Sequence, residues 1–188
     1  MRGHEAMRAG AATIYGHVFE NPRVGLVRNL FWNLFIDLDQ SGEDGDGAIQ
    51  SISCDWLTFA AHRWSDLDGV SLSDCRQPAL IECSIYRDSE HHWAHLDSFS
   101  IRSGAAVDRS NVTLTLHLPP ESNSETAADR LDVECEVRFE GIIVVPGNFT
   151  SPPATPADAA ILVAEFADLG ALRPPIWDRF RYVFESTD

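Results

Sequence analysis

The chain of 188 residues contains no lysine, so all 14 of its basic residues are arginines. They are outnumbered by 29 acidic residues, which gives a formal net charge of −15 at pH 7. A charge of this sign repels phosphate backbones and anionic membrane surfaces and attracts basic partners. The composition therefore argues against nucleic-acid and membrane binding and favours a basic protein partner. Exclusive use of arginine also fits GC-rich coding, from which we expect a bacterial source.

Long apolar runs and recognisable cysteine motifs are lacking as well. No run approaches the roughly 18 residues of a membrane span, and the first residues do not resemble a signal peptide, so we expect a cytoplasmic protein. Cys54, Cys75, Cys83 and Cys135 show no CxxC spacing, which argues against a zinc or dithiol redox motif. In the cytoplasm they are expected to be reduced thiols, at least two of them on apolar strand positions.

No catalytic motif is found either: the GxSxG elbow, the P-loop, the GxGxxG fingerprint and HExxH are all missing. This leaves enzyme chemistry open, because carboxylates that act as acid and base come together only on folding. Glu82, Glu134 and Glu136 lie on the polar faces of predicted strands and are candidates of this kind. Exposed strand acids more often serve solvation alone, so we predict no catalytic residue and no cofactor.

The clearest element lies between residues 131 and 145. From 131 to 140 apolar side chains alternate with charged ones, which is the pattern of a half-buried strand. Residues 142–145 are apolar on both faces, so the strand is expected to continue under cover until Pro146-Gly147 ends it. The rest of the protein is expected to assemble around this strand.

Further strands and two helices are predicted from periodicity and capping. Residues 24–39 fit both a helical stripe and a strand face, and we favour the strand because aromatic residues are dense there and a Gly-rich turn follows. A short helix is predicted over Asp55–Ser65 with Asp55 as N-cap, and a second after Thr155, with Pro156 and Asp158 in its first turn. The remaining predicted strands are 14–19, 48–54, 79–86, 95–102, 112–118 and 176–184.

Together these elements predict an α+β domain over residues 13–188, preceded by a loosely ordered terminus at 1–12. Repeated hairpin signals favour a mainly antiparallel sheet, or a two-layer sandwich, with the C-terminal helix packed across it. Strands 112–118 and 131–145 are expected to be antiparallel neighbours. The residues expected to share the core are Val112, Leu114, Leu116, Val133, Cys135, Val137, Phe139, Ile161, Leu162 and Phe166.

An acidic loop follows the predicted strand 24–39, and we interpret it as a hairpin tip that binds a basic partner. Its start resembles a calcium-binding loop, but Asp44 and Ala48 stand where that motif needs an apolar anchor and a bidentate glutamate. A solvated tip is therefore favoured over a calcium site. The predicted partner-binding residues are Asp37, Asp39, Glu43, Asp44 and Asp46.

Three histidines, His91, His92 and His95, form the densest group of metal-ligand types. On a helix, His91 and His95 would share a face and could chelate an ion. On a strand they lie about 13 Å apart at about 3.3 Å per residue, too far to share one. The flanking residues favour strands and a turn, so we prefer a solvated hairpin turn to a metal site.

Two functions remain. The first is a non-enzymatic interaction protein of the inhibitor or immunity type, whose acidic surface masks a basic partner such as a cationic toxin. The second is a small-molecule or metal-dependent enzyme on the same fold. A deep pocket with convergent polar groups and perturbed pKa values would favour the enzyme.

Overall fold

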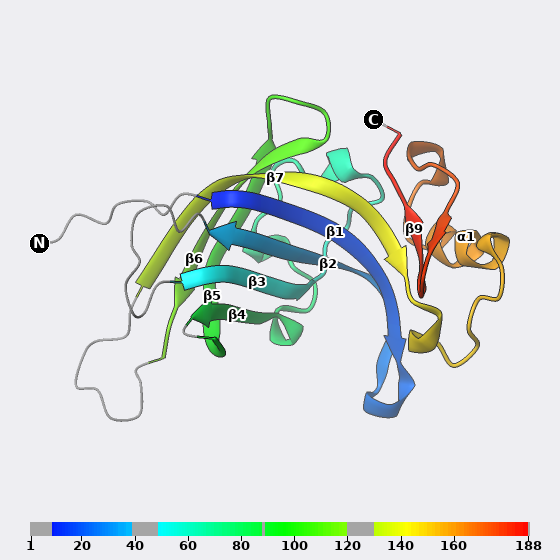
Figure 1. Cartoon of the computed structure of the whole chain (residues 1–188), viewed down its shortest axis with the longest axis horizontal. Helices are drawn as coiled ribbons and strands as arrows, with labels where there is room; N and C mark the ends of the chain where they lie inside the picture. The colour runs from blue at the N-terminus through cyan, green and yellow to red at the C-terminus, as the bar shows by residue number, and fades with distance from the viewer. Residues whose placement is uncertain (1–8, 39–48, 88, 120–129, 188) are drawn as a thin grey trace, which may run out of the picture.

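The computed structural model describes residues 9–38, 49–87, 89–119 and 130–187. Its strands are β1 (Ala9–Asn21), β2 (Leu26–Leu38), β3 (Ile49–Leu57), β4 (Glu82–Arg87), β5 (Glu90–Ser103), β6 (Arg109–His117), β7 (Arg130–Val144), β8 (Ile176–Asp178) and β9 (Arg181–Phe184). They form one sheet in the order β1-β2-β3-β4-β5-β6-β7-β9-β8. Because β1 also pairs with β7, the first seven strands close into a ring (Figure 1).

Every neighbouring pair in the sheet is antiparallel except β1 and β7, which run parallel. The predicted α+β fold with a mainly antiparallel sheet is confirmed. The alternative, a two-layer sandwich, is not formed, because the strands belong to a single sheet that closes on itself. The predicted antiparallel pairing of the strands at 112–118 and 131–145 is also confirmed, as β6 and β7.

Strand β7 joins the ring to the C-terminal part of the chain. One edge pairs with β6 over residues 130–138 and then with β9 over residues 142–144, while the other edge pairs with β1. Gly141 lies between the two partners of the first edge and has φ +105°, a conformation that favours glycine. A Cβ at this position would overlap the carbonyl oxygen of Phe184. Glycine therefore allows one strand to change partner without breaking the ladder.

The interior of the ring is filled by the predicted apolar faces. All predicted core members on β6 and β7 are buried, as is Leu162 on α1 (Pro156–Ala164). Ile161 was predicted wrongly, because it is 65% exposed, and Phe166 is only half-buried. The helix has nine residues and buries Ala159, Leu162 and Val163, so Ile161 points away from that face. The predicted packing of this helix on the sheet is confirmed, because its buried residues join the core of the sheet, and Figure 1 shows α1 beside β9.

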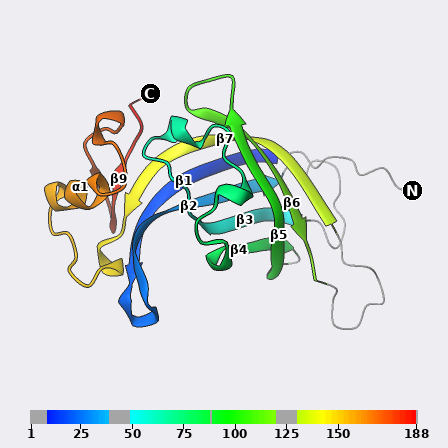
Figure 2. The ribbon, with the colours of Figure 1, turned by 180° about the vertical axis from the view of Figure 1, so that it is seen from behind.

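The helix predicted over Asp55–Ser65 is wrong. Strand β3 continues to Leu57, and Trp64–Leu67 forms only a short 3₁₀ helix, η2. The predicted N-cap at Asp55 does not start a helix, because β2 and β3 stay paired up to Trp32 and Leu57 and this pairing extends the strand. After β3 the chain crosses the ring through η2, η3 (Leu72–Asp74) and η4 (Pro78–Leu80), which contact β5 and β3 (Figure 2).

The C-terminal helix is confirmed with the expected cap. The Thr155 hydroxyl accepts a hydrogen bond from the Asp158 backbone N–H at 3.2 Å, and the Asp158 carboxylate accepts one from the Thr155 N–H at 2.9 Å. The predicted terminal strand is instead two strands, β8 and β9, which form a hairpin with Arg179 at φ +54° in its turn. The remaining 3₁₀ helices are η1 (Pro22–Val24), η5 (Pro146–Asn148) and η6 (Leu169–Ala171).

Two other boundaries differ from the prediction. Residues 24–39 form a strand as favoured, but β1 already begins at Ala9, within the stretch expected to be loose. Strand β5 begins at Glu90, so the three histidines lie in a strand and not in a turn. In the part of the chain that the structure describes, no helix is long and apolar enough to cross a membrane.

Candidate functional site

The outer face of strands β2 to β5 carries two exposed aromatic side chains. Phe35, Ser53, Ser84 and Trp93 are successive register partners across the four strands. Phe35 is 44% exposed and Trp93 is 66% exposed, while the serine hydroxyls between them lie 3.0 Å apart. Alternation along each strand sends the neighbouring residues into the core, so these four side chains share the solvent side. Exposed large aromatic residues on one strand face are typical of an interaction surface.

A pair of carboxylates lies in the neighbouring row of the same face. Asp55 on β3 is the register partner of Glu82 on β4. Burial, and then the charge of Glu82, raise the pKa of Asp55 from 3.8 to about 6. In the described part of the chain neither carboxylate forms an ion pair, and Glu82 accepts one hydrogen bond, from the Trp56 indole N–H at 3.3 Å. Two adjacent acids thus face solvent without a cation to balance them.

Trp56 follows Asp55 in a strained conformation. Its φ of +65° lies in the left-handed region, which is costly for a bulky residue. The strain is held by a hydrogen bond from its backbone N–H to the Asn33 side-chain oxygen at 3.3 Å and by aromatic contacts. The Trp56 ring centroid lies 5.0 Å from that of Phe19 and 5.2 Å from that of Phe31. Strained backbone of this kind concentrates at functional sites.

Asn33 lies beneath this strained residue with an unsatisfied donor. The residue is 4% exposed, and its side-chain nitrogen has no hydrogen-bond partner among the described residues. Leaving a buried polar group unpaired costs about 1–3 kcal/mol. The free protein therefore carries both a strained backbone and an unpaired donor next to the two carboxylates.

His17 and Tyr15 border the site on β1 as neutral groups. Burial lowers the pKa of His17 to about 4, and its Nε2 accepts a hydrogen bond from the Asn148 amide at 3.1 Å. Burial also raises the pKa of Tyr15, with a further rise from Asp55 and an opposing effect of Arg181. At pH 7 His17 and Tyr15 are therefore uncharged and do not balance the two carboxylates.

We call the exposed and half-buried side chains on the outer face of this region the acidic–aromatic face. One predicted partner-binding residue, Asp37, belongs to it, because it lies on the outer face of β2 two residues after Phe35 and is exposed. Asp39, Glu43, Asp44 and Asp46 lie outside the described residues, so their role stays a prediction. The members of the face are Phe35, Asp37, Asp55, Trp56, Glu82 and Trp93.

Of the candidate acids, the structure brings Glu82 alone into this face. Glu134 and Glu136 project from β7, where Glu136 pairs with Arg109 at 3.5 Å. Sequence reasoning missed Asp55, because its position before an apparent helical pattern indicated an N-cap. It also missed Asn33 and Trp56, whose contact joins positions 23 residues apart. A strand assignment for residues 55–57 would have placed Asp55 on the same outer face as Ser53, whereas its position opposite Glu82 depends on the register of β3 and β4.

The three histidines do not converge. His91 is exposed and packs against Tyr86 with ring centroids 5.0 Å apart, while His92 and His95 follow along the same strand. Within the described ranges no group of three His, Cys, Asp or Glu side chains is placed to hold a metal ion.

The chain matches no protein-family model, no curated protein and no solved structure.

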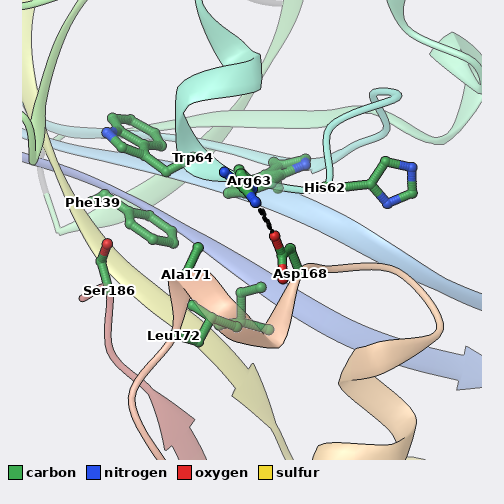
Figure 3. Close-up of a pocket in the computed structure, with 10 residues that line it drawn as sticks. His62, Arg63, Trp64, Phe139, Asp168, Ala171, Leu172 and Ser186 are labelled. Atoms are coloured by element: carbon green, nitrogen blue, oxygen red, sulfur yellow. Dashed lines mark hydrogen bonds and ion pairs between the residues drawn. The ribbon is translucent and has the colours of Figure 1, made fainter. Parts of the chain in front are cut away.

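A cavity lies where the C-terminal segment meets the chain after β3, and it is too small for a ligand. It measures about 10 Å³, the space of about one water molecule. Figure 3 shows Arg63 paired with Asp168 at its mouth, with Arg63 Nε donating to the carboxylate at 2.7 Å. Beside them the rings of Trp64 and Phe139 stack at 4.8 Å. We interpret this region as a structural contact between distant segments.

Proposed function

We propose that the protein is a non-enzymatic acidic interaction protein that binds a basic protein partner through the acidic–aromatic face. The observation that carries the proposal is the unbalanced pair Asp55 and Glu82, on the same outer face as the exposed Phe35 and Trp93. The net charge of −15 attracts a basic partner at long range, and the face supplies the short-range contacts.

The carboxylate pair favours a cation as the group that docks there. Repulsion from Glu82 contributes to the raised pKa of Asp55, and an arriving guanidinium or ammonium removes that repulsion. Arginine fits best, because its planar fork bonds carboxylates with two parallel hydrogen bonds and stacks on aromatic rings such as Trp93. The buried Asn33 donor also gains if an acceptor reaches it on binding.

The exposed aromatic residues supply the apolar part of such an interface. Tryptophan is enriched among the residues that dominate binding energy, and charged residues at the rim mainly set association rate and specificity. An inhibitor or immunity-type protein that masks the cationic surface of a toxin needs this combination. The proposed partner is therefore a basic protein with an exposed arginine beside an apolar patch.

One observation favours the second candidate, an enzyme acting on a small molecule. A carboxyl with a pKa of about 6 beside a second carboxylate is also suited to general acid–base chemistry. The two candidates differ in what Asp55 does: in an interaction protein it contributes to affinity, and in an enzyme to turnover.

The test of the interaction proposal compares charge variants with an oligoarginine peptide as probe. Asp55→Asn combined with Glu82→Gln should weaken binding by about tenfold and flatten its salt dependence. The matched control, Glu134→Gln with Glu136→Gln, removes the same charge from exposed positions on β7 and should change affinity by less than about twofold. Trp93→Ala should weaken binding without altering its salt dependence.

Binding is measured by calorimetry at low and at physiological salt. Equal weakening by both charge variants would mean unspecific attraction to net charge and would overturn the proposed site. Unchanged peptide binding by the Asp55 and Glu82 variant would reject the interaction proposal and leave the enzyme as the better candidate.

A further inference from the structure

Two of the four cysteines face each other across neighbouring strands. Cys54 on β3 and Cys83 on β4 are direct register partners, one position from the pair Asp55 and Glu82. Both side chains point into the core and are 0% and 2% exposed, with their sulfur atoms 2.7 Å apart. Cys75 contacts the Thr58 hydroxyl instead, at 3.5 Å, and so has a different partner.

This placement is the one that a cross-strand disulfide needs. A disulfide joins sulfur atoms at about 2.05 Å and requires side chains that project from facing positions on the same side of the sheet. Cys54 and Cys83 project from facing positions on the same side of the sheet, and their sulfur atoms, now 2.7 Å apart, need to approach by less than about 1 Å to form the bond. Cys135 has Val112 as its partner on the neighbouring strand, so the same argument does not extend to it.

We propose that Cys54 and Cys83 are a modification site at which oxidation forms a disulfide between β3 and β4. The expectation of four reduced thiols is thereby revised for this pair under oxidising conditions. The proposal does not depend on the proposed partner, since it rests on the register and the burial of the two cysteines.

The oxidant is a low-molecular-weight disulfide such as oxidised glutathione. One protein thiol, as its thiolate, attacks that disulfide and forms a mixed disulfide, releasing one glutathione thiol. The second protein thiolate then attacks the mixed disulfide and releases the second glutathione thiol. The protein loses two electrons and two protons in total, and one glutathione disulfide becomes two thiols.

Burial decides when this exchange takes place. The hydrogen bond with Cys83 and burial raise the pKa of Cys54 well above its usual value, so the folded protein holds little thiolate at this position. Exchange therefore occurs before β3 and β4 pair during folding, or when they open locally. Once formed, the bond is shielded from reductants by the same burial.

The experiment is refolding of the full chain in a glutathione redox buffer, followed by thiol counting in denaturant and peptide mass mapping. We expect two free thiols of the four, a loss of about 2 Da, and one crosslinked peptide pair containing Cys54 and Cys83. The bond spans 29 residues, so the oxidised protein should melt about 5–10 °C higher than the reduced one.

Two variants make the result specific. Cys54→Ala should leave three free thiols after the same treatment and abolish the oxidation-dependent shift in melting temperature. The matched control Cys75→Ala removes another buried cysteine and should keep the crosslink, leaving Cys135 as the one free thiol. Four free thiols in the oxidised wild type, or a crosslink through Cys75 or Cys135, would refute the proposal.

Discussion

Asp55 lowers the stability of the folded protein when its carboxyl group is ionised. It is half-buried and lies next to Glu82, so its charged form is disfavoured in the folded protein. The pKa is about 6 in the folded state and about 3.8 when unfolded. The carboxyl group of Asp55 therefore does not change the free energy of unfolding below about pH 4. As pH rises through about 6, the free energy of unfolding falls because the folded protein must hold the ionised carboxylate.

Replacing this residue should remove the pH-dependent cost. We expect Asp55→Asn to have the stability of the wild type near pH 4 and to be more stable by about 1–2 kcal/mol at pH 7, after allowance for partial solvent screening. Urea unfolding at a series of pH values measures the difference between the two proteins.

His17 changes the stability of the protein with pH in the opposite direction to Asp55, so the two contributions must be separated. Its pKa of about 4 lies below that of the unfolded state, so its contribution to stability is lost as pH falls from about 6.5 towards 4. Because both proteins contain His17, its contribution cancels in the difference. A difference that stayed constant from pH 4 to pH 7 would show that Asp55 is ionised normally in the fold.

At the scale of the element, β7 depends on one glycine. Gly141 combines a positive φ with a position at which any side chain meets the backbone of β9. A side chain at this position would therefore cause both backbone strain and a clash with β9. Movement of β7 away from β9 cannot relieve the clash without disturbing its pairing with β1 on the other edge.

Gly141→Ala is therefore expected to lower the free energy of unfolding by roughly 2–4 kcal/mol. The control is Gly147→Ala, where a Cβ would meet no atom within 4 Å, so its stability should stay within about 0.5 kcal/mol of the wild type. Chemical denaturation of the three proteins gives both values. Equal stability of the two variants would mean that β7 does not turn at Gly141 as described.

For the whole molecule, the question is what holds the C-terminal segment to the ring. Arg28 on β2 pairs with Glu165 at 3.2 Å, and Arg63 pairs with Asp168. These ion pairs are partly exposed, and such pairs contribute about 0–1 kcal/mol each. Phe184 on β9 is almost fully buried, and burial of an aromatic side chain outweighs both pairs.

Phe184→Ala should therefore cost about 3–5 kcal/mol, whereas Arg63→Gln should cost less than about 1 kcal/mol. Thermal unfolding ranks the two variants, and limited proteolysis after residue 145 reports whether the C-terminal segment has detached. If Arg63→Gln proved the more damaging, the contact in Figure 3 and not the buried β9 would hold the segment.

The type and place of most strands and of helix α1 follow from local sequence patterns. Residues 131–140 show the strict alternation of a half-buried strand. The capping of α1 by Thr155 and Asp158 is a local interaction that can be read from four consecutive residues. For the same reason the predicted core on β6 and β7 was correct. Periodicity reports burial wherever an element keeps one face to the core.

The closure of the sheet and the composition of the acidic–aromatic face depend on long-range pairing between strands. The parallel pairing of β1 with β7 joins residues more than a hundred positions apart, and no local pattern encodes it. Asp55 and Trp56 carry a helix-start pattern, yet pairing with β2 and β4 extends the strand through them. The register of that pairing sets Asp55 beside Glu82 and Cys54 beside Cys83, because cross-strand neighbours are fixed by hydrogen-bond register and not by sequence spacing.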